Sequence, residues 1–205
     1  MKTLIVTGGT GNLGTSVVRH LSTTYDCALI GLETGTDLSD EASVEAAVAK
    51  IAAERGAVWG LVHMVGGFAM GSVEESGAAQ WSKMLTLNLM TTVNTARAAL
   101  PYLRASRGRI VTVSAYASQS RPAGMAPYVV SKSAVNALVQ TLAGELAGTG
   151  VTVNAVLPTT LDTALNRQSM DPAKLVPLER VAETLAWLLS ESASHVNGAL
   201  VPLGT

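Results

Sequence analysis

Short apolar runs alternate along the chain with segments in which apolar residues recur every three or four positions. The short runs predict buried strands, at residues 4–6, 27–32, 58–65, 109–115, 151–157 and 199–201. The helical spacing predicts helices between these strands. The first carries Leu13, Val17, Val18 and Leu21, and the second carries Val44, Val48 and Ile51 behind an Asp40 cap. The third covers residues 80–99 and ends near Pro101, the fourth starts near Tyr128 and carries Val135, Leu138, Leu142 and Leu146, and the last covers residues 179–189. This alternation predicts an α/β fold: a doubly wound parallel sheet with helices on both faces.

Length and composition fit one domain over residues 1–205. The chain is 48% hydrophobic and 14% charged, which excludes a disordered protein. Its net charge of −1 gives no general reason to bind nucleic acid or an anionic membrane. We expect a small-molecule substrate instead.

The sequence favours a cytoplasmic protein. Cys27 is its single cysteine, so an internal disulfide framework is excluded. Residues 4–6 are too short for the apolar part of a signal peptide. No apolar run approaches the roughly 18 residues of a membrane helix, so we expect no membrane partner.

Two long polar connections mark the predicted ligand-binding edge. Residues 114–127 and 158–177 each follow a predicted strand and contain prolines. In an open parallel sheet, ligands bind at the carboxyl ends of the strands, where such connections lie.

A glycine-rich turn lies between the first predicted strand and the first predicted helix. Its glycines allow a close approach to a pyrophosphate, and the helix N-terminus presents free N–H groups to the anion. This context is typical of a Rossmann-type dinucleotide site, although an ordinary glycine turn has the same composition. A Walker-type site is disfavoured because no Gly-Lys-Ser/Thr follows. The candidate cofactor residues are Gly8, Thr10, Gly11, Asn12, Leu13 and Gly14.

The end of the second strand favours NAD over NADP. Glu33 lies about 20 residues beyond the turn, where a carboxylate accepts hydrogen bonds from a ribose hydroxyl. No Lys or Arg lies in the turn or between Cys27 and Asp40, so a 2′-phosphate lacks an obvious cationic partner. Glu33 is otherwise a solvated loop carboxylate. Asp37 is a candidate for the adenine edge or for a capping or loop role.

Tyr128 and Lys132 are four residues apart at the start of a predicted helix, which places them on one face. A free tyrosine has a pKa near 10. A nearby ammonium stabilises the phenolate, so we expect Lys132 to lower the pKa of Tyr128. This pair is the candidate acid–base centre.

Through these motifs and others, the chain resembles the short-chain dehydrogenase/reductase family along nearly its whole length. The matching segments are 7–14 (TGGTGNLG), 37–38 (DL), 63–67 (HMVGG), 87–89 (LNL), 108–114 (GRIVTVS), 128–132 (YVVSK) and 153–158 (VNAVLP). The resemblance implies that Gly66, Pro158 and Thr163 also hold the cofactor and that Lys132 holds the nicotinamide ribose. It implies a catalytic Asn88 that anchors a water chain near the lysine, or an Asn88 that only satisfies helix backbone.

Four positions depart from the family pattern. Asn12 stands where a glycine is usual, residues 63–66 replace Asn-Asn-Ala-Gly, and Thr159 follows Pro158 in place of glycine. The catalytic serine usually lies thirteen residues before the tyrosine, and this position is Ala115. The neighbouring Ser114 is expected to point to the opposite face.

Residues 65–71, 122–143 and 155–170 more closely resemble the dihydropteridine reductase subgroup, which also lacks the serine. This resemblance implies NADH-dependent reduction of quinonoid dihydropterin, with a hydride from C4 of NADH and a proton through Tyr128. It assigns Phe68 to the pterin ring, where the subgroup more commonly has tryptophan.

The sequence is compatible with three hypotheses for the function. The first is the dihydropterin reductase, or a reductase of a similar conjugated heterocycle. The second is a carbonyl or alcohol dehydrogenase in which Ser114 or Ser118 replaces the lost serine and Ser114 touches substrate. The third is a non-catalytic NAD-binding redox sensor, which the intact Tyr128 and Lys132 disfavour.

Several further residues are compatible with either a functional or a structural role. Asp162 and Thr163 either close over the cofactor amide or cap a helix, and residues 166–170 either touch substrate or form a surface loop. The histidines show no metal-ligand spacing, and His63 is expected as a hydrogen-bonded residue at a strand end. The helices at 80–99 and 128–147 are rich in apolar residues, and members of the family that the chain resembles often pair through these two helices, so we expect a homodimer or homotetramer.

Overall fold

The computed structural model describes residues 1–204 and contains one parallel sheet. Its strands have the order β2-β1-β3-β4-β5-β6 and every neighbouring pair is parallel. The strands are β1 (Lys2–Thr7), β2 (Tyr25–Ile30), β3 (Val58–His63), β4 (Arg109–Val113), β5 (Thr152–Pro158) and β6 (Leu200–Leu203). The predicted α/β fold class is confirmed.

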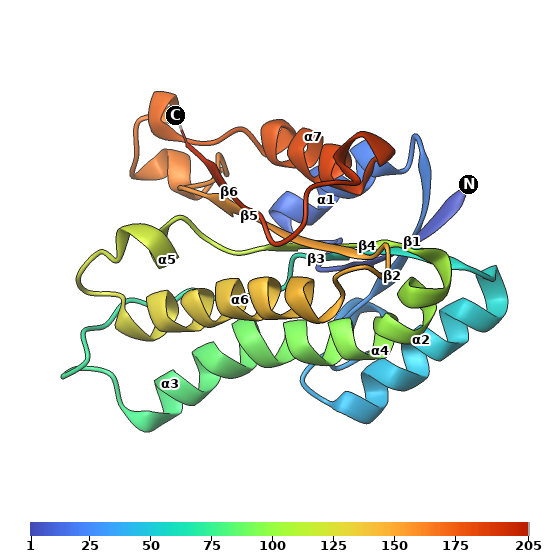
Figure 1. The fold of residues 1–205 in the computed structure, drawn as a ribbon. Coiled ribbons are helices and arrows are strands. Elements are labelled where there is room, and N and C mark those ends of the chain that lie inside the picture. Colours follow the sequence, from blue (N-terminus) through green and yellow to red (C-terminus); the bar gives the residue numbers. More distant parts are fainter. Residues whose placement is uncertain (205) are drawn as a thin grey trace.

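Helices cover both faces of the sheet (Figure 1). One layer contains α1 (Asn12–Leu21) and α7 (Leu178–Leu189), and the other contains α2 (Glu41–Arg55), α4 (Thr91–Ser106) and α6 (Ala126–Glu145). Successive side chains of β1 point to opposite faces of the sheet. Ile5 packs in the cluster under α2, α4 and α6, whereas Leu4 and Val6 pack under α1 and α7. Two buried cores therefore sandwich the sheet.

The strand order reverses direction beside β1. The chain passes from β1 to β2 on one side and then to β3 on the other. At a reversal of this kind, α/β proteins bind ligands outside the carboxyl ends of the two strands, a region that we term the crevice. The glycine turn follows β1 and residues 64–67 follow β3, so both border this crevice.

The long central helix extends further than its sequence suggested. We expected residues 80–99 with an end near Pro101. Instead α3 (Ala78–Leu85), a π-helical turn η2 (Thr86–Met90) and α4 form one continuous helical segment, which ends where Arg107 adopts φ 53°. Pro101 is exposed inside α4, where the solvent side tolerates the missing N–H.

Strand ends account for most other differences. Residues 31–32, 64–65 and 114–115 continue the apolar runs, but they leave the sheet and form the connections at its carboxyl edge. The four-residue helix α5 (Ala117–Ser120) was not expected from periodicity. Asp40 caps α2 as predicted, because its side chain accepts a hydrogen bond from the Ala42 N–H. Within residues 1–204, no helix is both long and apolar enough to cross a membrane.

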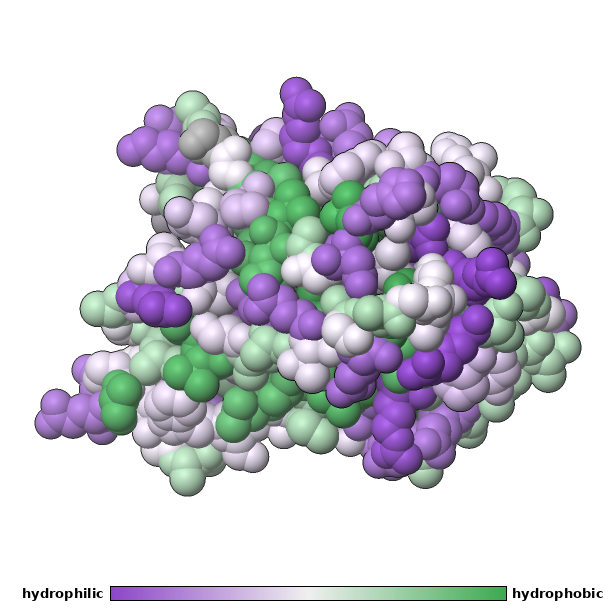
Figure 2. Space-filling view, viewed as in Figure 1, coloured by the Kyte–Doolittle hydropathy of each residue, from purple (hydrophilic) through white to green (hydrophobic). Residues whose placement is uncertain are grey.

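An apolar strip follows the β6 edge of the sheet. Figure 2 shows hydrophobic residues gathered between the two helical layers, over the region where β5 and β6 lie in Figure 1. Leu200, Val201 and Leu203 are only partly buried there. This edge is therefore less covered than the centre of the sheet.

In the glycine turn, the backbone of Gly14 lies very close to the carbonyl oxygen of Gly8. A Cβ atom built on Gly14 would lie 1.9 Å from the Gly8 carbonyl oxygen, closer than any real contact. Gly8 itself has φ +69°, which favours glycine. A Cβ on Gly11 would lie 3.5 Å from the same oxygen, an ordinary contact.

We expect Gly14→Ala to lower the free energy of unfolding by at least about 2 kcal/mol, because the methyl group forces the turn off the first turn of α1. Urea denaturation monitored by circular dichroism measures this change. Gly11→Ala is the matched control and should stay within about 0.5 kcal/mol of the parent protein. Equal losses in the two variants would contradict the packing argument.

Candidate active site

The amino end of α1 is open toward the crevice. Gly11 is its N-cap, so no side chain satisfies the first N–H groups, and no acidic residue lies in the first turn. Thr10, Gly11 and Asn12 are exposed, while Leu13 and Gly14 are buried against the sheet. Free N–H groups at a helix N-terminus attract an anion such as a pyrophosphate. The predicted turn residues are therefore brought together in a suitable cradle.

Glu33 lies close to this cradle. It belongs to a short 3-10 helix, η1 (Leu32–Thr34), directly after β2. The last residue of β2, Ile30, pairs with Thr7, which precedes the glycine turn. Glu33 is exposed, and its carboxylate lies over Gly31, where a Cβ would come within 2.5 Å of Oε2.

Asp37 makes a local turn instead of an open contact. Its Oδ1 accepts hydrogen bonds from the N–H and the hydroxyl of Ser39, at 2.8 and 2.7 Å. The side-chain bond from Ser39, followed by the backbone bond, lowers the pKa of Asp37. These bonds favour the loop role among the two that the sequence left open.

Tyr128 and Lys132 lie one turn apart near the start of α6 and face the carboxyl end of the sheet. The Lys132 Nζ donates to the Val113 carbonyl at 2.9 Å, at the end of β4. Lys132 is buried, and this burial lowers its pKa to about 8. The lysine is therefore close to its titration point at neutral to mildly alkaline pH.

Burial, and not the lysine, controls the pKa of Tyr128. Removal of the phenol from water raises its pKa to about 12. This differs from the sequence expectation that Lys132 lowers it: loss of water around the phenol is the cause of the shift, and the Lys132 ammonium donates to the Val113 carbonyl. Tyr128 is therefore a protonated phenol at neutral pH, and a proton donor.

Phe68 packs against the ring of Tyr128. The ring centroids are 4.9 Å apart and the planes meet at 77°, an edge-to-face arrangement. Phe68 is 59% exposed, so its other surface is open to solvent. The pair forms an aromatic platform beside the candidate proton donor.

Asn88 joins three segments of the site. Its Oδ1 accepts from the Gly67 N–H at 2.8 Å, and its Nδ2 donates to the Gly67 carbonyl at 3.0 Å and to the Ser131 hydroxyl at 2.8 Å. Ser131 lies between Tyr128 and Lys132 and donates to the Tyr128 carbonyl. Asn88 thus positions the loop after β3 against α6. Ser131 was missed from the sequence, although it lies within the YVVSK segment.

Gly66 is the small residue that lets this arrangement close. A Cβ there would lie 2.6 Å from the Asn88 Oδ1 and 3.0 Å from the Lys132 Nζ. Any side chain would separate the asparagine from the lysine. This contact gives the predicted Gly66 a steric role in the site.

The two serines near Ala115 point away from the crevice. The buried Ser114 hydroxyl donates to the Lys132 carbonyl at 3.1 Å, and the buried Ser118 hydroxyl donates to the Ala115 carbonyl at 2.6 Å. Both hydroxyl hydrogens are thus used by backbone. The substrate contact suggested for Ser114 is not favoured by this geometry.

Pro158 ends β5 at the same edge, and its carbonyl accepts from the Tyr116 N–H. Thr163 lies in the following connection, where its hydroxyl accepts from the Asn166 N–H at 3.2 Å. Asp162 pairs with Arg167 through a bond of 2.6 Å from Nη2 to Oδ2. Both side chains are thus bound within the connection itself.

His63 occupies the end of β3 as a buried, hydrogen-bonded residue, as predicted. Its Nδ1 lies 3.0 Å from the Thr7 hydroxyl and its Nε2 lies 3.3 Å from the Thr91 hydroxyl. Burial, with a smaller contribution from the charge of Lys132, lowers its pKa to about 3. The imidazole is therefore neutral at neutral pH.

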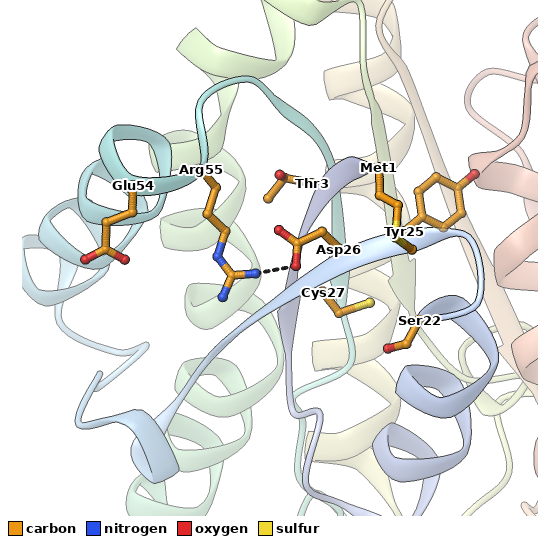
Figure 3. Close-up of a pocket in the computed structure, with 8 residues that line it drawn as sticks. All are labelled: Met1, Thr3, Ser22, Tyr25, Asp26, Cys27, Glu54 and Arg55. Atoms are coloured by element: carbon orange, nitrogen blue, oxygen red, sulfur yellow. Dashed lines mark hydrogen bonds and ion pairs between the residues drawn. The ribbon is translucent and has the colours of Figure 1, made fainter.

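A separate hollow lies at the opposite edge of the sheet. Figure 3 shows it lined by residues near the amino ends of β1 and β2, with the Arg55–Asp26 ion pair of 2.6 Å. Its volume is about 670 Å³. None of the sequence-predicted site residues lines it, so it is not the candidate active site. Within the described residues, no group of three His, Cys, Asp or Glu side chains is arranged to hold a metal ion.

Comparison with known proteins agrees with this geometry. The model of the short chain dehydrogenase family matches residues 32–174. The chain belongs to this family. It is therefore an oxidoreductase by family, and short-chain dehydrogenases bind NAD(P).

The relatives of this chain are named for different activities. The chain is 32% identical to the inactive 2-(S)-hydroxypropyl-CoM dehydrogenase 2 of Xanthobacter autotrophicus, over 81% of this chain and 80% of that protein. It is 29% identical to the dihydropteridine reductase of Dictyostelium discoideum, over 100% of this chain and 95% of that protein. Other relatives are dehydrogenases and reductases of various substrates.

A solved structure confirms the fold. The crystal structure of gox2181 superposes with a TM-score of 0.88 at 25% identity and covers 98% of this chain and 93% of that one. The short-chain dehydrogenase fold is thus shared over nearly the whole chain.

The buried His63 predicts acid sensitivity. Its pKa is 6.5 when unfolded and about 3 when folded, so the unfolded state binds more protons between these values. Stability therefore falls as pH drops below 6.5, by about 1.4 kcal/mol per pH unit from this residue, until pH approaches 3. In His63→Asn, urea denaturation between pH 7 and 4 should give a shallower dependence. Identical slopes in both proteins would contradict a neutral, buried His63.

Proposed function

We propose that the protein is an NADH-dependent reductase of quinonoid dihydropterin or of a similar conjugated heterocycle. The observation that carries this proposal is the Phe68–Tyr128 pair, an exposed aromatic ring packed edge-on against a protonated phenol. A flat conjugated ring stacks on Phe68 and presents its nitrogen atoms to the Tyr128 hydroxyl. Such a substrate needs a proton donor and an aromatic surface, but no second hydroxyl.

The residues around the crevice fit a dinucleotide. The uncapped amino end of α1 suits the pyrophosphate, and Gly8 and Gly14 let the turn that precedes this helix fold tightly on itself and against Met64 and Val65. Glu33 would accept hydrogen bonds from the adenosine ribose, and its negative charge disfavours a 2′-phosphate. Gly66, Pro158 and Thr163 lie at the same edge and would border the nicotinamide half. When bound, NADH supplies the hydride from C4 of its nicotinamide.

Tyr128 and Lys132 divide the remaining chemistry. Tyr128 donates its phenolic proton to the substrate, since its raised pKa keeps that proton in place at neutral pH. Lys132 would hold the nicotinamide ribose and supply a positive charge beside the phenolate that remains. Asn88 holds Gly67 and Ser131, and so fixes the loop after β3 against the part of α6 that carries Tyr128 and Lys132. We retain Asn88 in the catalytic set as the candidate anchor of the water chain.

The similarity to the Dictyostelium dihydropteridine reductase supports this proposal, because it extends over the full length of this chain. The alanine at position 115 supports it as well. A carbonyl or alcohol dehydrogenase is the second candidate, since several relatives are named as such. That candidate needs a hydroxyl in place of the missing serine, and both neighbouring serines donate to backbone carbonyls.

A redox sensor without catalysis is the third candidate. One relative is described as inactive, so membership of the family does not by itself establish turnover. A sensor has no use for a buried lysine one helical turn from a partly buried tyrosine, because burying the ammonium costs free energy. The Tyr128–Lys132 pair therefore favours an enzyme.

We also propose a cytoplasmic homodimer or homotetramer that pairs through the α3–α4 segment and α6. Met90 and Val130 lie on these helices and are 43% and 46% exposed. Exposed apolar side chains on long neighbouring helices are typical of an interface between copies.

The first test is NADH oxidation with freshly generated quinonoid dihydropterin, beside a panel of small ketones and quinones and with NADPH in parallel. We expect turnover on the pterin with NADH, weaker activity with NADPH, and a loss of at least about 100-fold in kcat in Tyr128→Phe, because the proton donor is removed. Tyr102→Phe removes a phenol from α4, away from the site, and should retain full activity.

The outcomes separate the three candidates. Turnover on ketones alone would move the protein to the carbonyl dehydrogenases. NADH binding without turnover on any substrate would favour the sensor. Full activity of Tyr128→Phe would refute the role given to Tyr128, and equal affinities for NADH and NADPH would refute the role given to Glu33.

The buried lysine predicts a pH limit. Lys132 is charged below its pKa of about 8 and neutral above it. Since kcat/KM reports the free enzyme, log(kcat/KM) for NADH should fall with a slope of about −1 above pH 8. Tyr128, with a pKa of about 12, adds no further step below pH 10. Initial rates between pH 6 and 10 measure this profile, and a profile that stays flat to pH 10 would contradict it.

A further inference from the structure

His63 is buried at the point where two arms of the candidate site diverge. It ends β3 and is 1% exposed, with one hydroxyl on each side of its ring. Thr7 lies directly before the glycine turn, and Thr91 begins α4 directly after the π-helical turn that carries Asn88. The function proposed above assigns no role to this imidazole.

The surrounding hydrogen bonds determine where its proton lies. The Thr91 hydroxyl donates its single hydrogen to the Leu87 carbonyl at 2.8 Å, so it can only accept from His63. Nε2 therefore carries the proton. On the other side, the Thr7 oxygen accepts from the Met64 N–H at 3.2 Å and donates its hydrogen to the bare Nδ1.

These bonds form one chain with a single direction. It runs from the Met64 N–H through Thr7 and His63 to Thr91 and the Leu87 carbonyl. Only a neutral imidazole fits, since it offers one donor and one acceptor on opposite sides of a rigid ring. A protonated ring would present a second donor to Thr7 and break the chain.

We propose that His63, as the neutral Nε2–H tautomer, is a positioning residue that holds the phosphate-binding turn and the Asn88 turn in fixed register. This inference rests on the dinucleotide site proposed above. Movement of Thr7 displaces Gly8, and movement of Thr91 displaces Asn88 and with it Gly67 and Ser131. His63 therefore links the pyrophosphate end of the site to the Tyr128–Lys132 end.

The test removes one hydroxyl from the chain and compares it with a matched hydroxyl outside it. Thr91→Val leaves the Nε2–H without an acceptor. Thr95→Val is the control, because the buried Thr95 hydroxyl donates to the Thr91 carbonyl one helical turn further along and does not contact His63. Thr91→Ser keeps the hydroxyl and serves as the rescue variant.

We expect kcat/KM for NADH to fall about tenfold in Thr91→Val, since a buried donor loses its partner, and to stay within about twofold of the parent in Thr95→Val and Thr91→Ser. The thermal midpoints of both valine variants should fall by similar amounts. Equal kinetic losses in Thr91→Val and Thr95→Val would show a structural role alone and overturn the inference. A parent protein that does not bind NADH would instead overturn the proposed function, and the inference with it.

A measurement on the unmodified chain covers the case in which Thr91→Val does not fold. In ¹⁵N NMR of histidine-labelled protein, one of the three imidazoles should keep the shifts of the neutral Nε2–H tautomer from pH 8 to 5, and addition of NADH should change its shifts. If all three imidazoles titrate near pH 6.5, or if NADH moves none of them, the inference is overturned.

Discussion

The burial of the Lys132 ammonium is the constraint on which the site depends. A charged group out of water needs partners, and the structure provides the Val113 carbonyl at the end of β4. This bond ties α6 to the carboxyl edge of the sheet, and glycine at position 66 leaves room for both the Asn88 Oδ1 and the Lys132 Nζ, which a Cβ would approach to 2.6 and 3.0 Å. Asn88 in turn needs the π-helical turn η2 to reach Gly67 and Ser131 together. A single buried charge therefore determines the local shape of three separate segments.

The alternation of apolar runs predicted the sheet and its covering helices, because burial on both faces leaves a strong signal in each strand. The ends of these elements were less predictable. Val65 and Ala115 are as apolar as the strand residues before them, but the chain turns there toward the ligand edge. Pro101 was expected to end a helix, yet on the exposed side of α4 its missing N–H is tolerated. Periodicity records burial, and it does not record which hydrogen bonds close an element.

The candidate site shows the same division. Tyr128, Lys132 and the glycine turn were found from spacing, since helical and turn geometry is local. The orientation of the Ser114 hydroxyl and the Asn88 contacts depend on partners from 18 to 43 residues away, and the raised pKa of Tyr128 depends on burial. Spacing along the sequence reveals neither. Ala115 was visible in the sequence as a departure from the family. The structure adds that the hydroxyls of the two neighbouring serines, Ser114 and Ser118, donate to backbone carbonyls.

The order of the strands also has a consequence for how the molecule is made. β1 pairs with β2 and then with β3, so the first 63 residues contain three adjacent strands, one half of the sheet. β4, β5 and β6 then add outward in chain order, each beside the strand made before it. The sheet can thus assemble as the chain leaves the ribosome, without threading any later strand between two earlier ones. The cost is a succession of temporarily open strand edges, of which the last closes only when β6 has been synthesised.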